Sequence, residues 1–173
     1  MSCRASRALG PLLVLAAGLA AAGCGVSSDK LMTPAPDFEA RTLTGGALKL
    51  SALRGKVVLL DFWATWCGPC EETIPRLEAL DDRYRAQGLE IVGVSVDDDA
   101  GEVPPFVRAH GMRYPVFVDE GKQVMRLYAV RAVPTTVLVD RKGRVRARWM
   151  GTGDDVVEEM ERDIRRMLEE KES

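Results

Sequence analysis

Residues 56–70 read KVVLLDFWATWCGPC, an apolar run that ends in two cysteines separated by glycine and proline. The segment Lys56–Trp63 is almost continuously apolar and rich in β-branched and aromatic residues, which predicts a central buried strand. From Cys70 onward the apolar residues recur at helical spacing as far as Tyr84. We therefore expect the first cysteine, Cys67, at the junction between a buried strand and the N-terminus of a helix.

The placement of Cys67 and Cys70 points to redox chemistry. A cysteine at a helix N-terminus faces unpaired backbone N–H groups and the positive end of the helix dipole, and both stabilise a thiolate. Two intervening residues allow one helical turn to bring the second sulfur within bonding reach. We expect Cys67 to be the exposed nucleophile and Cys70 the shielded resolving thiol. A structural staple and half a zinc site are the alternatives, but zinc lacks a second cysteine pair here, and His110 alone cannot complete a tetrahedral site.

Asp61 interrupts the apolar strand. An unpaired carboxylate is costly to bury, so this side chain is expected to keep its proton to an unusually high pH. The acidic run from Asp97 to Asp99, in contrast, is expected to be a solvated loop that follows a strand. We predict no metal site.

The rest of the chain alternates strand-like and helix-like segments, which predicts an α/β fold with a mixed central sheet and helices on both of its faces. The alternation from Phe38 to Leu50 around Thr44–Gly46 predicts a β-hairpin. The further strands expected are 90–96, 114–118, 135–140 and 144–150, and the further helices expected are 102–110, 122–128 and the amphipathic 154–169.

Two segments carry a family resemblance. Residues 58–70 resemble the active-site segment of the thioredoxin superfamily, and Val133–Thr136 (Val-Pro-Thr-Thr) resembles its cis-proline loop. The extra helix and strand between Asp97 and Val118, together with the leader, resemble the exported TlpA/ResA branch. The resemblance covers about residues 34–171 and implies a thioredoxin fold with an N-terminal β-hairpin and an inserted helix–strand unit.

The resemblance also implies roles for acidic residues. In thioredoxins the acid that matches Asp61 exchanges a proton with the second cysteine, here Cys70. The TlpA/ResA pattern often places its acid three residues after that cysteine, where this chain has Thr73. We therefore assign proton transfer to Asp61, and expect Glu71 and Glu72 to lie on a solvated helix face.

The same resemblance implies a substrate-binding surface around the disulfide. The Val133–Pro134 bond is expected to be cis, an uncommon feature in proteins. In the family, this loop leaves the N–H and carbonyl of the preceding residue free for a substrate strand. The residues expected to contact substrate are Trp66, Gly68, Pro69, Val133 and Pro134.

The N-terminus reads as a targeting segment. Arg4 and Arg7 precede the apolar stretch Gly10–Ala22, which is short for a membrane span and closes in small residues. We expect residues 1–23 to be a signal peptide and Cys24 to be the lipidated first residue of the mature chain. Cleavage by ordinary signal peptidase after Ala20–Ala22, and an uncleaved anchor, are the alternatives.

After the leader, residues 24–33 are expected to form a polar tether, and residues 34–173 a single thioredoxin-like domain. Of the four cysteines in the 173-residue chain, only Cys67 and Cys70 fall inside that domain, too few for a disulfide scaffold. The net charge of −2, with basic and acidic residues interspersed, argues against a nucleic-acid partner.

These features predict an exported thiol–disulfide oxidoreductase without a cofactor other than its dithiol. Gly68–Pro69 matches the dipeptide of thioredoxin, a strong reductant at about −270 mV, which favours the reducing direction. The resemblance implies exported disulfide-containing clients, apocytochrome c among them, and a membrane thiol–disulfide carrier as electron donor. The alternatives are a peroxiredoxin-like thiol peroxidase, whose Pro-x-x-x-Thr-x-x-Cys frame is absent because Ala64 stands three residues before Cys67, and a non-enzymatic thioredoxin-fold lipoprotein.

Overall fold

The computed structural model describes residues 32–170. The expected signal peptide 1–23, the lipidation site Cys24 and the tether as far as residue 31 lie outside the described residues, as do residues 171–173. Among residues 32–170, no helix is long and apolar enough to cross a membrane.

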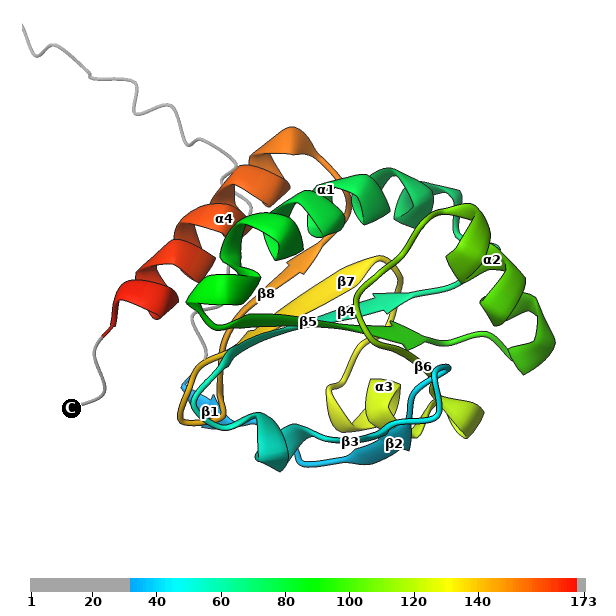
Figure 1. The fold of residues 1–173 in the computed structure, drawn as a ribbon, viewed down its shortest axis with the longest axis horizontal. Helices are drawn as coiled ribbons and strands as arrows, with labels where there is room; N and C mark the ends of the chain where they lie inside the picture. The colour runs from blue at the N-terminus through cyan, green and yellow to red at the C-terminus, as the bar shows by residue number, and fades with distance from the viewer. Residues whose placement is uncertain (1–31, 171–173) are drawn as a thin grey trace, which may run out of the picture.

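A six-stranded mixed sheet forms the centre of the molecule, with the strand order β1-β8-β7-β4-β5-β6 (Figure 1). Strands β4, β5 and β6 run parallel, whereas β7 is antiparallel to both β4 and β8 and β1 is antiparallel to β8. The strands are β1 Thr33–Pro34, β4 Val57–Trp63, β5 Leu89–Ser95, β6 Val116–Val118, β7 Thr135–Val139 and β8 Arg144–Met150.

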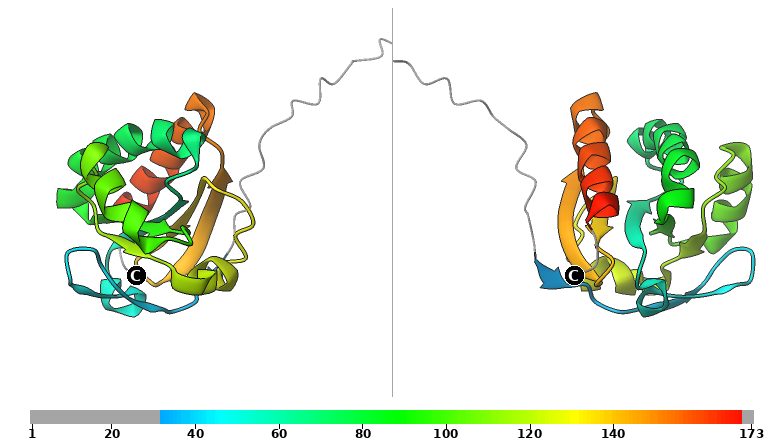
Figure 2. Two further views of the ribbon diagram at one scale, coloured as in Figure 1. Left: turned by 90° about the vertical axis from the view of Figure 1, so that its right-hand side faces the viewer. Right: turned by 60° about the vertical axis from the view of Figure 1, so that its left-hand side comes forward.

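Helices cover both faces of this sheet. Helices α1 (Gly68–Tyr84), α2 (Val103–Ala109) and α4 (Asp154–Glu169) lie on one face, and α3 (Gln123–Leu127) lies on the other (Figures 1 and 2). The small antiparallel sheet of β2 and β3 lies on the same side as α3. The remaining elements are β2 Glu39–Arg41, β3 Ala47–Lys49 and the short 3₁₀ segments η1 Leu50–Leu53, η2 Arg85–Gln87, η3 Ala100–Glu102 and η4 Glu120–Lys122.

Strand β4 is buried along its whole length and supplies side chains to both layers. The Phe62 ring lies 5.9 Å from the ring of Tyr128, next to α3, whereas the Trp63 ring stacks 5.0 Å from Phe106 of α2. Because successive side chains of a strand point to opposite faces, Asp61 shares the face of Trp63, which α1 and α2 cover. The buried acid therefore lies on the same side of the sheet as the cysteine-bearing helix.

The expected fold is confirmed, including the N-terminal hairpin, the inserted α2–β6 unit and the C-terminal helix 154–169. Several elements are one or two residues shorter than predicted, and in two of them a local feature explains the difference. The strand expected at 114–118 begins only at Val116, because Tyr114 is buried inward and Pro115 has no N–H to donate. The helix expected at 122–128 covers Gln123–Leu127, because Lys122 has a left-handed backbone conformation with φ 56°.

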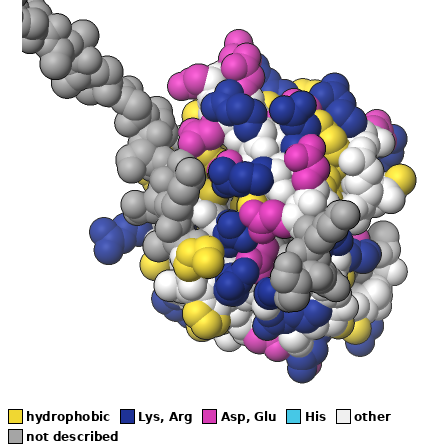
Figure 3. Space-filling view, turned by 90° about the vertical axis from the view of Figure 1, so that its left-hand side faces the viewer, with side chains coloured by type: hydrophobic (Ala, Val, Ile, Leu, Met, Phe, Trp, Pro, Cys, Tyr) yellow, Lys and Arg dark blue, Asp and Glu magenta, His cyan; other side chains and the backbone are white. Residues whose placement is uncertain are grey.

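Charged side chains of both signs are mixed on the surface. On the face drawn in Figure 3, Lys and Arg side chains are interspersed with Asp and Glu side chains. Several form ion pairs, as in the contacts of Arg146 with Asp140 and Glu170, both at 3.1 Å. The fixed charge is therefore largely compensated locally.

Candidate active site

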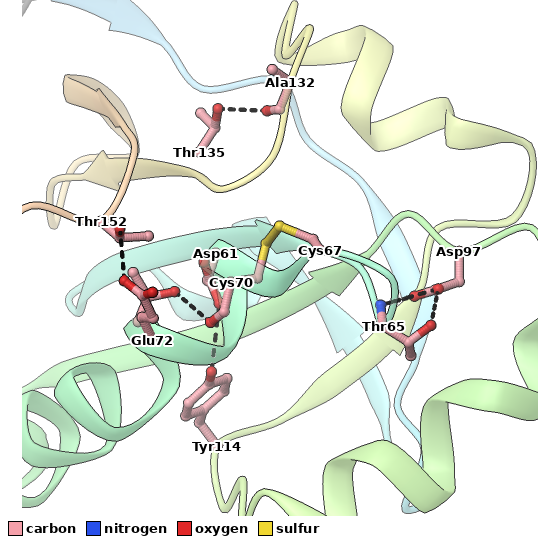
Figure 4. The surroundings of a disulfide bond; sticks show 11 residues. Asp61, Thr65, Cys67, Cys70, Glu72, Asp97, Tyr114, Ala132, Thr135 and Thr152 are labelled. Carbon is pink, nitrogen blue, oxygen red and sulfur yellow. Dashed lines mark hydrogen bonds between the residues drawn. A yellow bond between two sulfur atoms is a disulfide. The ribbon is translucent and has the colours of Figure 1, made fainter.

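A disulfide joins Cys67 and Cys70 at the start of α1, with 5.3 Å between their Cα atoms (Figure 4). Cys67 is the N-cap residue of the helix, and its carbonyl accepts a hydrogen bond from the backbone N–H of Cys70 at 2.9 Å. Pro69 lies in the first turn, where a missing N–H leaves no hydrogen bond unmade. The sulfur of Cys67 therefore lies at the positive end of the helix dipole.

The two cysteines differ in exposure. Cys70 is 0% exposed and Cys67 is 5% exposed, while the preceding Trp66 is 66% exposed. Gly68 and Pro69 are also exposed. These three residues form an exposed surface next to Cys67, whereas Cys70 is shielded. Cys67 is therefore more buried than the expected exposed nucleophile, although Cys70 is the more shielded of the two, and the order of nucleophile and resolving thiol stays a prediction.

Asp61 is completely buried among the side chains that surround the disulfide (Figure 4). Its Oδ2 atom accepts a long hydrogen bond of 3.5 Å from the hydroxyl of Tyr114, and its Oδ1 atom has no hydrogen-bond partner among the described residues. Burial raises the pKa of Asp61 to about 7, and the Tyr114 hydroxyl acts in the opposite direction. Asp61 can therefore gain or lose a proton near neutral pH.

No acid occupies the position three residues after Cys70. Thr73 is buried there, and its hydroxyl donates a 2.7 Å hydrogen bond to the carbonyl of Cys70. Glu71 and Glu72 are exposed, as expected, and Glu72 accepts a 3.4 Å hydrogen bond from Thr152. Asp61 is consequently the acid that this arrangement offers to Cys70.

The loop before β7 borders the disulfide from the other side, as Figure 4 shows for Ala132 and Thr135. The Val133–Pro134 peptide bond is cis, as predicted. The Thr135 hydroxyl donates a 2.7 Å hydrogen bond to the carbonyl of Ala132, which closes the loop. Within residues 32–170, the backbone N–H and carbonyl of Val133 have no hydrogen-bond partner. They are free to pair with an extended peptide.

The prediction that Asp97 lies in a solvated loop is wrong. Asp97 is only 5% exposed and accepts hydrogen bonds from the Thr65 hydroxyl at 2.6 Å and the Ser95 hydroxyl at 2.7 Å. Its neighbours Asp98 and Asp99 are exposed, as expected. The pairing of β4 with β5 aligns Trp63 with Ser95, so the loops that follow the two strands meet. Parallel pairing of the two predicted strands was the signal that could have located Asp97.

The contacts of two further residues, Tyr114 and His110, were not predicted from the sequence. Tyr114, whose hydroxyl faces Asp61, was assigned only to a strand, and no local pattern marks its role. His110 was considered as a zinc ligand, and its ring stacks on Phe106 with 4.0 Å between the ring centres. Among residues 32–170, no group of three or more His, Cys, Asp or Glu side chains is arranged to hold a metal ion.

The fold and the cysteine pair together define the class of thioredoxin-fold thiol–disulfide oxidoreductases. Residues 31–148 match the AhpC/TSA family, and the chain belongs to that family.

Similar proteins carry names of the same class. The chain is 39% identical over 130 residues to the thiol-disulfide oxidoreductase ResA of Geobacillus kaustophilus. The aligned residues make up 75% of this chain and 74% of that protein. It is 38% identical over 111 residues to ResA of Bacillus thuringiensis, an alignment that spans 64% of either chain. Among solved structures, a thiol:disulfide interchange protein DsbE from Chlorobium tepidum is similar with a TM-score of 0.77 and 36% identity, covering 80% of this chain and 97% of that one.

Proposed function

We propose that this protein is an extracytoplasmic reductase that transfers two electrons from its Cys67–Cys70 dithiol to disulfides of exported proteins. One observation carries the proposal: Cys67, which is 5% exposed and lies next to exposed Trp66, is bonded to a fully buried Cys70, with the buried acid Asp61 beside the pair. The names of the ResA and DsbE relatives support the same chemistry. The Gly68–Pro69 dipeptide supports the reducing direction.

The reaction proceeds through a mixed disulfide. The thiolate of reduced Cys67, stabilised by the N-terminus of α1, attacks one sulfur of the client disulfide and releases the other as a thiolate, which takes a proton from solvent. The Cys70 thiol then gives its proton to Asp61 and attacks the sulfur of Cys67. This second step breaks the mixed disulfide, so the client leaves with two thiols and the Cys67–Cys70 disulfide re-forms. A general base whose pKa is about 7 is suited to that proton transfer at neutral pH.

Substrate binding is assigned to the rim of the disulfide. Exposed Trp66, Gly68 and Pro69 form one side, and Val133 with Pro134 forms the other. A client segment in extended conformation can add its backbone hydrogen bonds to the free N–H and carbonyl of Val133. Such backbone pairing tolerates many client sequences, which suits a general reductase.

The proposed location rests on the leader, and the proposed partners rest on the resemblance to the TlpA/ResA branch. We assign residues 1–23 to a signal peptide, Cys24 to lipidation and the segment from Cys24 to residue 32 to a tether that holds the domain at the membrane, facing the periplasm or the cell exterior. The tether is one residue shorter than the expected 24–33, because Thr33 pairs with Val145 in the central sheet. A soluble periplasmic form is the alternative. A membrane thiol–disulfide carrier would re-reduce the pair, and apocytochrome c is among the candidate clients. The dithiol needs no additional cofactor, and no nucleic-acid partner is assigned.

Reduction of insulin by the purified protein with dithiothreitol tests this function. We expect rapid precipitation of insulin chains with the wild type and none above background with Cys67→Ser. Parallel measurement of hydrogen peroxide consumption tests the peroxidase alternative, which Ala64 disfavours because a threonine belongs at that position in the peroxidase frame. Peroxide turnover without insulin reduction would overturn the proposal, and inactivity in both assays would support a non-enzymatic protein.

A further inference from the structure

We propose that Tyr114 is a positioning residue for the redox reaction: it holds Oδ2 of Asp61 through its hydroxyl and leaves Oδ1 free to receive the proton of Cys70. This inference rests on the proton-transfer role proposed for Asp61. Tyr114 lies two residues before the start of β6 and is 2% exposed, so its hydroxyl is directed into the core rather than to solvent. The two residues lie 53 positions apart in the sequence and meet only through the fold.

A glycine makes room for the tyrosine ring. Gly93 on β5 is the partner of Asp61 in the parallel ladder, and an added Cβ there would lie 3.0 Å from Cγ2 of Val116, 3.1 Å from Nε1 of Trp63 and 3.2 Å from Cε2 of Tyr114. The backbone N–H of Gly93 also donates a 2.8 Å hydrogen bond to the carbonyl of Pro115. The absence of a side chain at Gly93 therefore lets the Tyr114 ring cross the strand and reach the carboxyl group on the neighbouring strand.

The two carboxyl oxygens of Asp61 have different surroundings. Oδ2 faces the Tyr114 hydroxyl, whereas Oδ1 is buried without a hydrogen-bond partner among residues 32–170. A buried polar atom without a hydrogen-bond partner is destabilising, so the unpaired Oδ1 atom of Asp61 calls for an explanation. An oxygen kept free beside a disulfide is suited to take the proton of a thiol, because the bond to Tyr114 prevents it from rotating away.

The charged groups near Tyr114 keep its hydroxyl protonated. Burial raises the pKa of Tyr114 well above its usual value, and the negative charges of Asp61, Glu78 and Asp81 act in the same direction. Glu78 and Asp81 both lie on α1. Glu78 forms an ion pair with Arg113, and Asp81 forms one with Arg85.

The other two neighbours of Asp61 in the sheet carry no charge: Thr136 pairs with it from β7 and Gly93 from β5. Tyr114 is therefore a hydrogen-bond donor throughout the neutral range, and this donation favours the ionised form of Asp61.

Tyr114→Phe tests the assignment by removing only the hydroxyl. We would follow the carboxyl carbon of Asp61 by NMR between pH 5 and 9 in the reduced protein. Loss of the donated hydrogen bond should move the titration midpoint upward by about half a unit to one unit. At pH 7 less Asp61 is then ionised, so the insulin-reduction rate should fall roughly threefold. Tyr84→Phe is the matched control, because it removes a hydroxyl that donates at 2.6 Å to Glu161 on α4, and it should leave both readouts unchanged.

A second variant perturbs the contact between Tyr114 and Asp61 from the neighbouring strand β5. Gly93→Ala keeps the hydroxyl but adds a methyl group that crowds the Tyr114 ring together with Val116 and Trp63, so we expect the ring to shift and the Asp61 midpoint to move upward again. An unchanged midpoint in folded Tyr114→Phe, or a wild-type Asp61 that titrates near 4, would overturn the inference. Failure of the wild type to reduce insulin would instead remove the proposed function, because the NMR titration does not depend on turnover.

Discussion

Asp97 accepts hydrogen bonds from both the backbone N–H of Thr65, at 3.1 Å, and the hydroxyl of Thr65, at 2.6 Å. Thr65 lies two residues before Cys67, in the segment that leads from β4 into α1. The carboxylate of Asp97 therefore ties the end of β5 to the segment that positions the first cysteine. Ser95 completes the network with a 2.7 Å hydrogen bond from its hydroxyl.

Asp97→Ala should destabilise the protein and slow insulin reduction. The substitution leaves the Thr65 N–H, the Thr65 hydroxyl and the Ser95 hydroxyl without their acceptor in a mostly buried site, which costs about 2–3 kcal/mol. Chemical denaturation measures the loss. Asp98→Ala is the matched control, because Asp98 is exposed and its contact with Lys122 at 2.9 Å is a surface ion pair worth less than about 1 kcal/mol. Equal effects of the two substitutions would contradict the structural role of Asp97.

Substitution of Cys67 and substitution of Cys70 should have different effects on the reaction. Cys67→Ser should abolish turnover, because no thiolate then attacks the client. Cys70→Ser should accumulate a mixed disulfide between Cys67 and the client, which non-reducing gel electrophoresis and mass spectrometry detect. Alkylation of the reduced wild-type protein should modify Cys67 first, since Cys70 is fully buried. Preferential alkylation of Cys70 would reverse the assignment.

Asp61→Asn should slow exchange near neutral pH and stabilise the fold at higher pH. The amide cannot accept the proton of Cys70, so the pH-dependent part of the rate should disappear. The raised pKa means that Asp61 contributes stability below its unfolded value of 3.8, and this contribution is lost as the pH rises through about 7.

Denaturation of wild type and Asp61→Asn at pH 4 and pH 8 measures this stability term. The shift from 3.8 to about 7 corresponds to at most about 4 kcal/mol at pH 8. The variant should therefore gain stability relative to wild type between the two pH values. If Asp61→Asn reduces insulin at the wild-type rate throughout the neutral pH range, the proton-transfer role is contradicted, whatever the stability measurement gives.

Local sequence signals were sufficient for much of the fold and for the reactive pair. The apolar run into Cys67, the helical spacing after Cys70 and the Val133–Pro134 loop each have a signature within a few residues. Contacts between distant segments were beyond that kind of signal. Tyr114 meets Asp61 only because Gly93 leaves space between them, and Asp97 is buried only because β4 and β5 run side by side. Acidic composition alone therefore gave the wrong environment for Asp97.

The N-terminus of the mature protein should be Cys24 carrying lipid. Because Thr33 already belongs to β1, residues 25–32 would then form a tether that spans at most about 30 Å when extended, which keeps the disulfide close to a membrane-bound electron donor. Mass spectrometry of the protein purified from the membrane fraction identifies the first residue and its modification. An unmodified start at Gly23 would indicate ordinary secretion, and an intact leader would indicate a signal anchor.

The reduction potential of the Cys67–Cys70 pair tests the proposed reductase most directly. Equilibration of the protein in glutathione buffers of graded ratio, followed by acid quenching and thiol alkylation, gives the fraction oxidised at each potential. A reductase with the thioredoxin dipeptide should have a potential near −270 mV, more reducing than about −220 mV. A potential near −120 mV, which is that of a strong disulfide-forming oxidant, would contradict the reducing role.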